Sequence, residues 1–174
     1  MFTMIVAFDK TRGIGKNNSM PWHFREDLNY FSKLTIGSND NNNAIIMGKN
    51  TWMSLPGPLK KRDNLIVSTS LSISQNSPKN NYIKTFTTLE EVENFCNTQH
   101  YTNVWIIGGS QLYAEFLTTN KVDKIYVTSI DNTYDCDVFF PKLEESQWKL
   151  INEDHKVENN TNISYLIYEK KNTI

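Results

Sequence analysis

The stretch VWIIGGS, at Val104–Ser110, is a short apolar run that leads straight into two glycines, and AIIMGK, at Ala44–Lys49, has the same form. Short β-branched runs that end at glycine indicate buried strands. Helical patterns follow both of them, at Gln111–Leu117 and at Thr51–Leu55. Because strands and helices alternate in this way, the sequence predicts an α/β fold with a mainly parallel central β-sheet and helices on both faces.

The rest of the chain extends this plan in both directions. Further strand patterns lie at Thr3–Phe8, Asn64–Val67, Lys124–Ile130, Trp148–Val157 and Ile163–Glu169, and further helical patterns at Arg25–Leu34 and Leu89–Phe95. Thr88 and Glu91 have the spacing of a capping box at the start of the latter helix. Only the polar segment Glu158–Asn162 separates the last two strands, which predicts an antiparallel C-terminal edge hairpin.

Size and composition restrict the class of protein. A chain of 174 residues suits a single domain over residues 1–174. With 18 basic and 19 acidic residues, it has no charge excess that would favour nucleic acid or a membrane surface. Cys96 and Cys136 cannot form a disulfide framework, and no Cys/His spacing suggests a metal site. Met1–Phe8 lacks the basic residues of a signal peptide. We therefore expect a cytoplasmic protein.

Three segments are predicted to be loops. Ser38–Asn43 and Ser74–Asn81 are rich in Asn and Ser and read as surface loops. Lys10–His23 is long and contains glycines, so we expect it to act as a lid. Within it, Gly13–Asn18 follows a strand but lacks the third glycine of a Rossmann motif, and Pro21-Trp22 interrupts the chain before any helix.

Asp27 is an acid among the apolar positions of the first predicted helix. The spacing i, i+3, i+4 of a buried stripe is followed by Phe24, Leu28, Phe31 and Leu34. A buried carboxylate is costly unless it is neutralised or hydrogen-bonded. An internal arginine, a backbone amide or a capping role would satisfy it. Alternatively, its two oxygens would accept paired N–H groups of a ligand such as a pterin, and a raised pKa would suit proton transfer.

The glycines after the two strands suit a dinucleotide. Glycine lets the backbone approach a phosphate, and the following helix offers free N–H groups. Lys49 and Thr51 add a charge and a hydroxyl at one junction, and Gly108-Gly109 form the other. A third strand ends in Ser68–Ser70, whose hydroxyls suit a ribose phosphate. Each glycine taken alone predicts no more than a turn.

Taken together, these motifs resemble those of dihydrofolate reductases and occur in the same order. They are Ile5–Ala7, Gly13–Gly15, Met20–Trp22, Asp27-Leu28 with Phe31, Ile46–Lys49 with Thr51-Trp52, Arg62–Asn64, Ile107–Gly109 with Tyr113, and Asp137 before Phe139–Pro141. The resemblance implies NADPH-dependent reduction of 7,8-dihydrofolate to 5,6,7,8-tetrahydrofolate, by hydride transfer to C6 with protonation at N5.

The resemblance also implies roles for individual residues. Asp27 matches the acid that binds the pterin and assists protonation, and Met20, Trp22 and Tyr113 match residues beside the reacting atoms. The substrate pocket would comprise Ile5, Val6, Ala7, Leu28, Phe31, Leu55, Leu59, Arg62, Ile107 and Thr128. In this set, Thr128 would hydrogen-bond the acid and Arg62 would bind the α-carboxylate of the glutamate. Without the resemblance, Arg62 reads as a solvated charge in the run Lys60–Arg62.

The cofactor implied by the resemblance is NADPH, and no metal is expected. The matching residues are Ala7, Ile14, Gly15, Lys49, Asn50, Thr51, Ser68, Thr69, Gly108, Gly109, Ser110, Gln111 and Leu112. Lys49 and Thr69 favour NADPH over NADH, because a 2′-phosphate favours a cation and hydroxyl donors. We also expect binding of antifolate-like small molecules and a monomeric state.

Two departures and two alternatives complete the prediction. Gly57 stands where some relatives carry a second cation, and Cys136 stands before Asp137 where a smaller residue is usual. A reductase of pyrimidine intermediates in riboflavin synthesis shares the glycine junctions but not Met20–Trp22 with Asp27. A non-catalytic binding module would keep the fold without turnover. An assay with NADPH and dihydrofolate separates the three functions.

Overall fold

The computed structural model describes residues 1–38, 42–75 and 82–172. Its strands are β1 (Phe2–Phe8), β2 (Gly13–Gly15), β3 (Asn43–Gly48), β4 (Asp63–Val67), β5 (Ser74–Gln75), β6 (Ile83–Phe86), β7 (Asn103–Ile106), β8 (Val122–Ile130), β9 (Val138–Phe139), β10 (Trp148–Glu158) and β11 (Thr161–Lys170). Its helices are α1 (Arg25–Ile36), α2 (Lys49–Ser54), α3 (Leu89–Gln99) and α4 (Ser110–Thr118). Every predicted helix and strand is present, with somewhat different ends.

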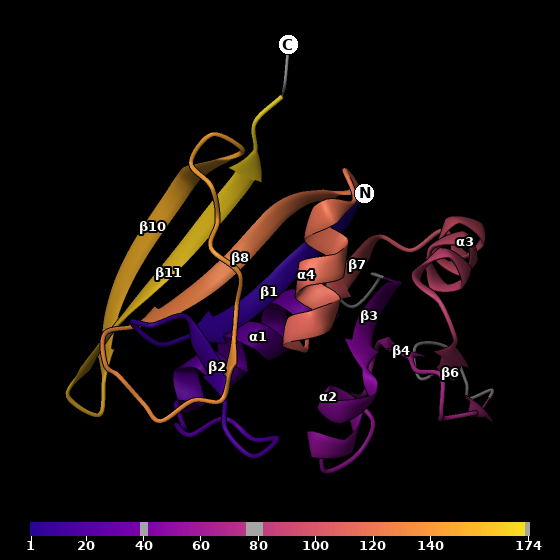
Figure 1. Ribbon diagram of the computed structural model, residues 1–174, viewed down its shortest axis with the longest axis horizontal. Coiled ribbons are helices and arrows are strands. Elements are labelled where there is room, and N and C mark those ends of the chain that lie inside the picture. The colour runs from indigo at the N-terminus through magenta and orange to yellow at the C-terminus, as the bar shows by residue number, and fades with distance from the viewer. Residues whose placement is uncertain (39–41, 76–81, 173–174) are drawn as a thin grey trace.

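One sheet runs through the molecule in the order β10-β11-β8-β1-β7-β3-β4-β6-β5 (Figure 1). The strands from β8 to β6 pair in parallel. At one edge, β11 pairs antiparallel with β8, and β10 pairs antiparallel with β11. The prediction of a mainly parallel sheet with an antiparallel C-terminal edge hairpin is therefore confirmed.

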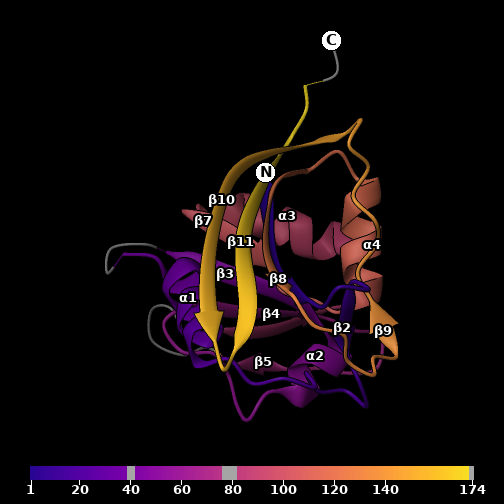
Figure 2. The same cartoon turned by 90° about the vertical axis from the view of Figure 1, so that its left-hand side faces the viewer.

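The core lies in two layers because successive residues of a strand point to opposite faces of the sheet. Met4 of β1 and Ile46 of β3 pack with residues of α3 and α4, including Phe116. Their neighbours Ile5 and Ile45 pack with residues of α1 and α2 on the other face. Figure 2 shows α1 and α4 on opposite sides of the strands. Burying each of these large side chains stabilises the fold by roughly 2 kcal/mol.

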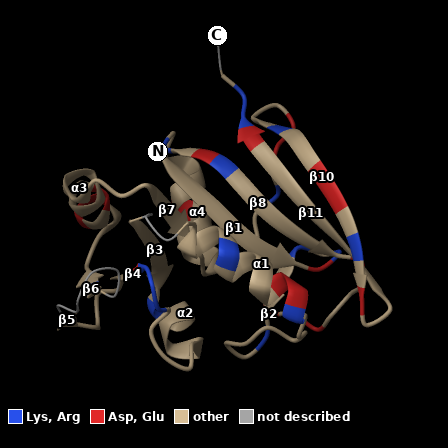
Figure 3. Cartoon of the chain, turned by 180° about the vertical axis from the view of Figure 1, so that it is seen from behind, with Lys and Arg blue, Asp and Glu red and all other residues tan. Residues whose placement is uncertain are grey.

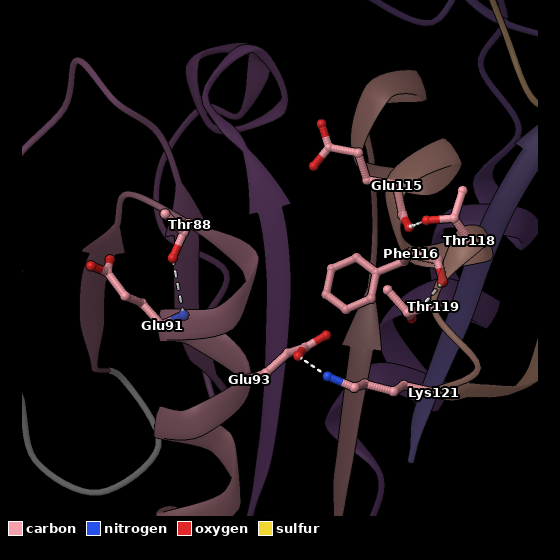
Figure 4. Close-up of polar contacts among 8 residues, drawn as sticks. All are labelled: Thr88, Glu91, Glu93, Glu115, Phe116, Thr118, Thr119 and Lys121. Carbon is pink, nitrogen blue, oxygen red and sulfur yellow. Dashed lines mark hydrogen bonds and ion pairs between the residues drawn. The ribbon is translucent and has the colours of Figure 1, made fainter.

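Polar contacts determine where α3 begins and how it meets the neighbouring loop (Figure 4). Thr88 Oγ1 accepts a hydrogen bond from Glu91 N at 3.2 Å, as a capping box requires. The return contact differs from the prediction, because Glu91 Oε2 accepts from Thr87 N at 2.8 Å. One turn later, the buried Glu93 carboxylate pairs with Lys121 Nζ, which comes from the loop before β8. This ion pair joins α3 to the loop before β8.

The Asn-rich segments differ from the prediction of surface loops at Asn43 and at Ser74–Gln75, whereas Ser38 is exposed and outside the helices and strands as predicted. Asn43 is fully buried in β3, and its Nδ2 donates to the backbone oxygens of Thr35 at 3.0 Å and Ile36 at 3.1 Å. The prediction is therefore wrong at Asn43, since its amide satisfies the last carbonyls of α1. Ser74–Gln75 forms the short strand β5. Residues 39–41 and 76–81 lie outside the described residues.

The sequence patterns do not predict β2, β5, β6 and β9. The strand β6 pairs with β4 and buries Ile83 and Phe86. Its pattern is obscured by Lys84, whose Nζ lies 5.3 Å from the ring centre of Phe86. The other three strands have only two or three residues and depend on their partners for pairing. Their formation depends on tertiary pairing more than on a local sequence pattern.

The C-terminal hairpin turns at Asn159-Asn160, where both residues have positive φ, 50° and 56°. Asparagine tolerates this left-handed conformation, which matches the twist of a two-residue hairpin. The strand β10 forms the outer edge of the sheet, and its outward positions are exposed and partly charged (Figure 3). Charges on an open edge discourage pairing with other chains.

Candidate functional site

The carboxylate of Asp27 lies on the first turn of α1 and faces the sheet. The residue is 8% exposed, as the sequence predicts for an acid on the inner side of this helix. Thr128 on β8 donates a hydrogen bond from Oγ1 to Asp27 Oδ1 at 2.7 Å. The expected partnership of Thr128 with the helix acid is therefore present.

The charge of Asp27 has no basic partner among the residues that the structure describes. The ion pairs found over the described ranges do not include this residue, so an internal arginine does not neutralise it. Burial raises the pKa of the Asp27 carboxyl, the hydrogen bond from Thr128 lowers it, and the charge of Glu158 raises it further. The net effect is a raised pKa, which suits a group that takes part in proton transfer.

The apolar residues predicted to line the substrate pocket fall into three groups. One cluster on the α1 face contains Ile5, Phe31, Leu55, Leu59 and Ile107. Ala7 packs beside Trp22 in a neighbouring cluster. Val6 points to the opposite face of the sheet, so that only its backbone adjoins this side.

The predicted buried stripe of α1 is only partly correct. Phe24 is buried, but Leu28 is 39% exposed, and Met20 on the preceding loop is 49% exposed. Phe31 and Leu34 are half-buried. The buried residues of the helix itself are Asp27 and Thr35. An apolar face that is left open beside a buried acid is typical of a ligand site rather than of a core.

Arg62 is a buried cation without a carboxylate partner among the described residues. It is 4% exposed, which excludes the reading as a solvated charge. Its Nη1 donates to Thr35 Oγ1, its guanidinium carbon lies 5.9 Å from the ring centre of Phe31, and its Nε is buried without a hydrogen bond. Burial lowers the pKa of Arg62 to about 10. Such an arginine is suited to bind an anion.

Three parallel strand ends meet at one edge of the sheet. They carry Gly48-Lys49, Gly108-Gly109 and Ser68-Thr69, because β7, β3 and β4 are neighbours. Gly48 N donates to Gly108 O at 2.8 Å. The peptide between Gly108 and Gly109 is cis, and Gly108 has φ of 125°, which only glycine adopts readily. A Cβ atom there would lie 3.3 Å from Thr51 Oγ1.

The polar side chains around these strand ends are held in different ways. Lys49 Nζ donates to Ser70 Oγ at 2.9 Å, while Ser68 Oγ accepts from Ser70 N at 3.2 Å. Thr69 is exposed. At the start of α4, Gln111 Nε2 donates to Glu115 Oε1 at 3.0 Å. The other predicted cofactor residues comprise exposed Asn50, half-buried Ile14, Thr51 and Ser110, and buried Gly15 and Leu112.

Tyr113 and Trp22 are both buried next to functional candidates. Tyr113 Oη donates to Ile5 O at 2.6 Å, and burial raises the pKa of its phenol. It therefore links α4 to the backbone of β1. Trp22 is 8% exposed, packs 5.2 Å from the ring of Tyr134, and buries Nε1 without a hydrogen-bond partner.

The segment predicted as a lid is attached to the loop after β8. It contains β2, which pairs with β9, and Asn17 N donates to Asp137 Oδ2 at 3.1 Å. A Cβ atom on Gly13 would lie 2.5 Å from Cys136 Sγ, so the cysteine packs directly against this glycine. Glycine at position 13 is therefore required by the size of Cys136.

Two functional candidates were not identified from the sequence. Asp9 is 1% exposed and accepts hydrogen bonds from Gly13 N at 2.9 Å and Tyr134 N at 2.8 Å. Although burial alone would raise it, the pKa of Asp9 is lowered by these hydrogen bonds and those from Thr11. Glu158 contacts the start of α1 from the distant hairpin. In the sequence, only the position of Asp9 directly after a buried strand indicates that its carboxylate is buried and accepts backbone hydrogen bonds.

In residues 1–38, 42–75 and 82–172, no helix has the length and apolarity needed to cross a membrane. The same ranges contain no group of three His, Cys, Asp or Glu side chains suited to a metal ion.

Comparison with known proteins gives a consistent result. The family described as dihydrofolate reductase matches residues 1–170. The dihydrofolate reductase of Bacillus subtilis (strain 168) is 33% identical, and the match covers 99% of this chain and 96% of the relative. That of Bos taurus is 33% identical, with 97% and 96% covered. The bifunctional dihydrofolate reductase-thymidylate synthase of Plasmodium berghei (strain Anka) is 30% identical, and the match covers 94% of this chain but 35% of that protein.

Proposed function

The chain belongs to the dihydrofolate reductase family, and from this premise we propose that it reduces 7,8-dihydrofolate with NADPH and that Asp27 binds the pterin and assists protonation at N5. One observation carries the assignment of the site. Asp27 and Arg62 are buried charges without counter-ions among residues 1–38, 42–75 and 82–172, and both adjoin α1. The hydroxyl of Thr35 contacts Arg62. Thr35 lies eight residues after Asp27 on α1, which corresponds to about 12 Å along a helix. Dihydrofolate has paired N–H groups at one end and a carboxylate towards the other.

The residues at the three strand ends fit a dinucleotide. Gly48 N, the helix start at Ser110 and the backbone of Gly108-Gly109 converge without Cβ atoms between them. Lys49 lies close enough to Ser70 to serve the same anion. We assign Lys49, Ser68 and Thr69 to the adenosine phosphate side and Gly108-Gly109 to the pyrophosphate. The bound cofactor would supply the hydride, which no protein side chain provides.

Asp27 performs two tasks in this proposal. Its oxygens accept the 2-amino and N3 hydrogens of the pterin, while Thr128 keeps the carboxyl oriented. Because burial raises its pKa, the carboxyl keeps a proton to a higher pH than an exposed aspartate. In the complex, the negative charge of the ionised Asp27 favours protonation of N5 electrostatically, and the proton would arrive through water near Met20 and Trp22. Tyr113, whose hydroxyl donates to Ile5 O, would line the site behind the reacting ring.

The remaining groups orient the substrate and exclude water. The apolar cluster with Phe31, Leu55 and Ile107, together with Leu28, would hold the ring and the aminobenzoyl group. Arg62 would bind the glutamate α-carboxylate through its planar guanidinium. Around Gly57, the space for an added Cβ is empty, so the second carboxylate would meet solvent. The segment Lys10–His23 would act as the lid over the cofactor and pterin.

The decisive experiment mixes protein, NADPH and dihydrofolate and follows the near-ultraviolet absorbance of NADPH. We expect turnover, and an Asp27→Asn variant should lose about a hundredfold of it at neutral pH, because a carboxamide cannot assist protonation. Some activity should return in acid, where solvent protonates the substrate. Glu144→Gln, which changes an exposed carboxylate, is the matched control.

The outcomes of this assay distinguish the possible functions. Tight binding of an antifolate without any NADPH oxidation would support a binding module instead of an enzyme. An Asp27→Asn variant with wild-type rates at every pH would refute the role of Asp27. We further propose a cytoplasmic monomer. The free thiols of Cys96 and Cys136 are compatible with a reducing compartment, and light scattering tests the monomeric state.

A further inference from the structure

The turn of the C-terminal hairpin meets the start of α1, which carries Asp27 (Figures 1 and 2). Glu158 is the last residue of β10, and its Oε1 accepts a hydrogen bond from Arg25 N at 2.9 Å. Its Oε2 accepts from Glu26 N at 3.2 Å. Phe24, at the N-cap of α1, makes no side-chain cap of its own. A carboxylate from a distant strand therefore closes the first turn of the helix, where negative charge is favourable.

We propose that Glu158 is a positioning residue for Asp27. Its carboxylate holds the first turn of α1, and with it Asp27, against the sheet, and it adds a second negative charge to the surroundings of Asp27. The inference rests on the proposed function, in which the place and protonation of Asp27 determine turnover.

Further contacts attach the same end of the hairpin to α1. Lys156 Nζ lies 3.6 Å from Glu26 Oε2. On the next strand, Tyr165 packs with its ring centre 4.5 Å from that of Tyr30. Ile163 and Tyr165 belong to one buried cluster with Phe24. Because these contacts hold the hairpin in place, Glu158 meets the helix in a defined position rather than as a mobile surface acid.

The charged side chains around Asp27 are mostly negative, and the neighbouring tyrosines are neutral because burial raises the pKa of their phenols. From α1 itself come Glu26 and Tyr30, and Lys156 is occupied by Glu26. From the hairpin come Glu158 and Tyr165, with Asp154 near Tyr30, while β8 contributes the neutral Thr128. Burial is the main cause of the raised pKa of Asp27, Thr128 opposes it, and Glu158 adds to it. Removing the charge of Glu158 should therefore lower the pKa of Asp27.

Two substitutions separate the cap from the charge. Glu158→Gln keeps an acceptor oxygen but removes the charge, whereas Glu158→Ala removes both. Glu153→Gln, an exposed glutamate of the same strand that pairs with His155, is the matched control. The readout is the titration of the Asp27 carboxyl by ¹³C NMR in the free protein. The Asp27 resonance is identified by its loss in Asp27→Asn.

We expect Glu158→Gln to move the Asp27 midpoint down by a few tenths of a pH unit at low salt and by less at high salt, because added salt screens the charge. Glu153→Gln should leave the midpoint unchanged. Glu158→Ala should show the same shift and, in addition, a several-fold rise in KM for dihydrofolate, which Glu158→Gln should largely avoid.

A wild-type Asp27 midpoint in Glu158→Gln at low salt would overturn the proposal. So would a Glu158→Ala variant that melts at a lower temperature but keeps the wild-type KM and midpoint, since that result describes a purely structural cap. The titration needs no substrate. It therefore stays informative if the wild-type protein fails to reduce dihydrofolate, a result that would count against the proposed function instead.

Discussion

Replacing Arg62 with methionine should stabilise the protein and weaken substrate binding at the same time. Burial lowers the pKa of Arg62 from the ordinary value of an arginine to about 10. At about 1.4 kcal/mol for each pKa unit, holding this charge inside costs the folded state up to about 3.5 kcal/mol, and screening by solvent reduces this cost to roughly 2–3 kcal/mol. Methionine keeps the apolar contact with Phe31 but loses the hydrogen bond to Thr35, worth about 1 kcal/mol. The free energy of unfolding of Arg62→Met should therefore rise by about 1 to 2 kcal/mol.

The same substitution removes the cation proposed to bind the glutamate carboxylate. If this hydrogen-bonded charge pair contributes about 2.7 kcal/mol to binding, its loss raises KM for dihydrofolate roughly a hundredfold. A dihydropterin without the glutamate should bind both proteins equally. Urea unfolding and steady-state kinetics measure the two effects, with Arg25→Met as the exposed control.

The pH dependence of the unfolding free energy tests whether the charge of Arg62 destabilises the folded protein. Below about pH 10, Arg62 is charged in both the folded and the unfolded protein, and the full cost of burying the charge destabilises the wild type. As the pH rises through about 10, the folded protein loses this charge, so the difference in unfolding free energy between Arg62→Met and the wild type should decrease. A variant that is less stable than the wild type and keeps its KM would refute both parts of the reasoning.

Three other substitutions test separate contacts. Thr128→Val removes a hydrogen bond that lowers the pKa of Asp27, so the midpoint of the pH–rate profile should move to higher pH while kcat falls; a midpoint that moves down would contradict this. Gly13→Ala should destabilise the protein by about 1–3 kcal/mol in urea unfolding, because the methyl group meets Cys136, and adding Cys136→Gly should recover most of the loss. Lys121→Met leaves the Glu93 carboxylate buried without its cation and should cost roughly 2 kcal/mol, whereas Lys121→Met with Glu93→Gln should cost less; equal losses would show that the ion pair is unimportant.

The central sheet could be predicted because its signals are local. Residues Ala44–Met47 and Val104–Ile107 are continuous apolar runs, as expected for strands that are covered on both faces. The inward position of Asp27 could also be predicted, because it depends only on helical spacing. The partner of this acid could not be predicted from spacing, since Thr128 lies about a hundred residues away. It came from the family resemblance.

Other features depend on contacts that no local pattern encodes. Asn43 looks like part of a polar loop, yet its amide satisfies two carbonyls at the end of α1. The exposure of Leu28 could not be predicted from its spacing, because the helical stripe does not reveal which of its positions the sheet covers. The cap from Glu158 likewise requires the hairpin to fold against the helix. In each case the residue is known from the sequence, but its contacts or its exposure depend on tertiary packing.

Asp27 and Arg62 illustrate how the site differs from the remaining core. Glu93, also buried, is matched by Lys121, as expected of a charge that serves stability. In the part of the chain that the structure describes, Asp27 and Arg62 have neutral hydrogen-bond partners, so no ion pair there offsets their desolvation. Both charges would be compensated by a ligand that carries donors at one end and a carboxylate at the other. The folded state is thus less stable than it could be at the two positions where the proposed substrate would bind, and a bound substrate should raise the unfolding temperature by relieving both.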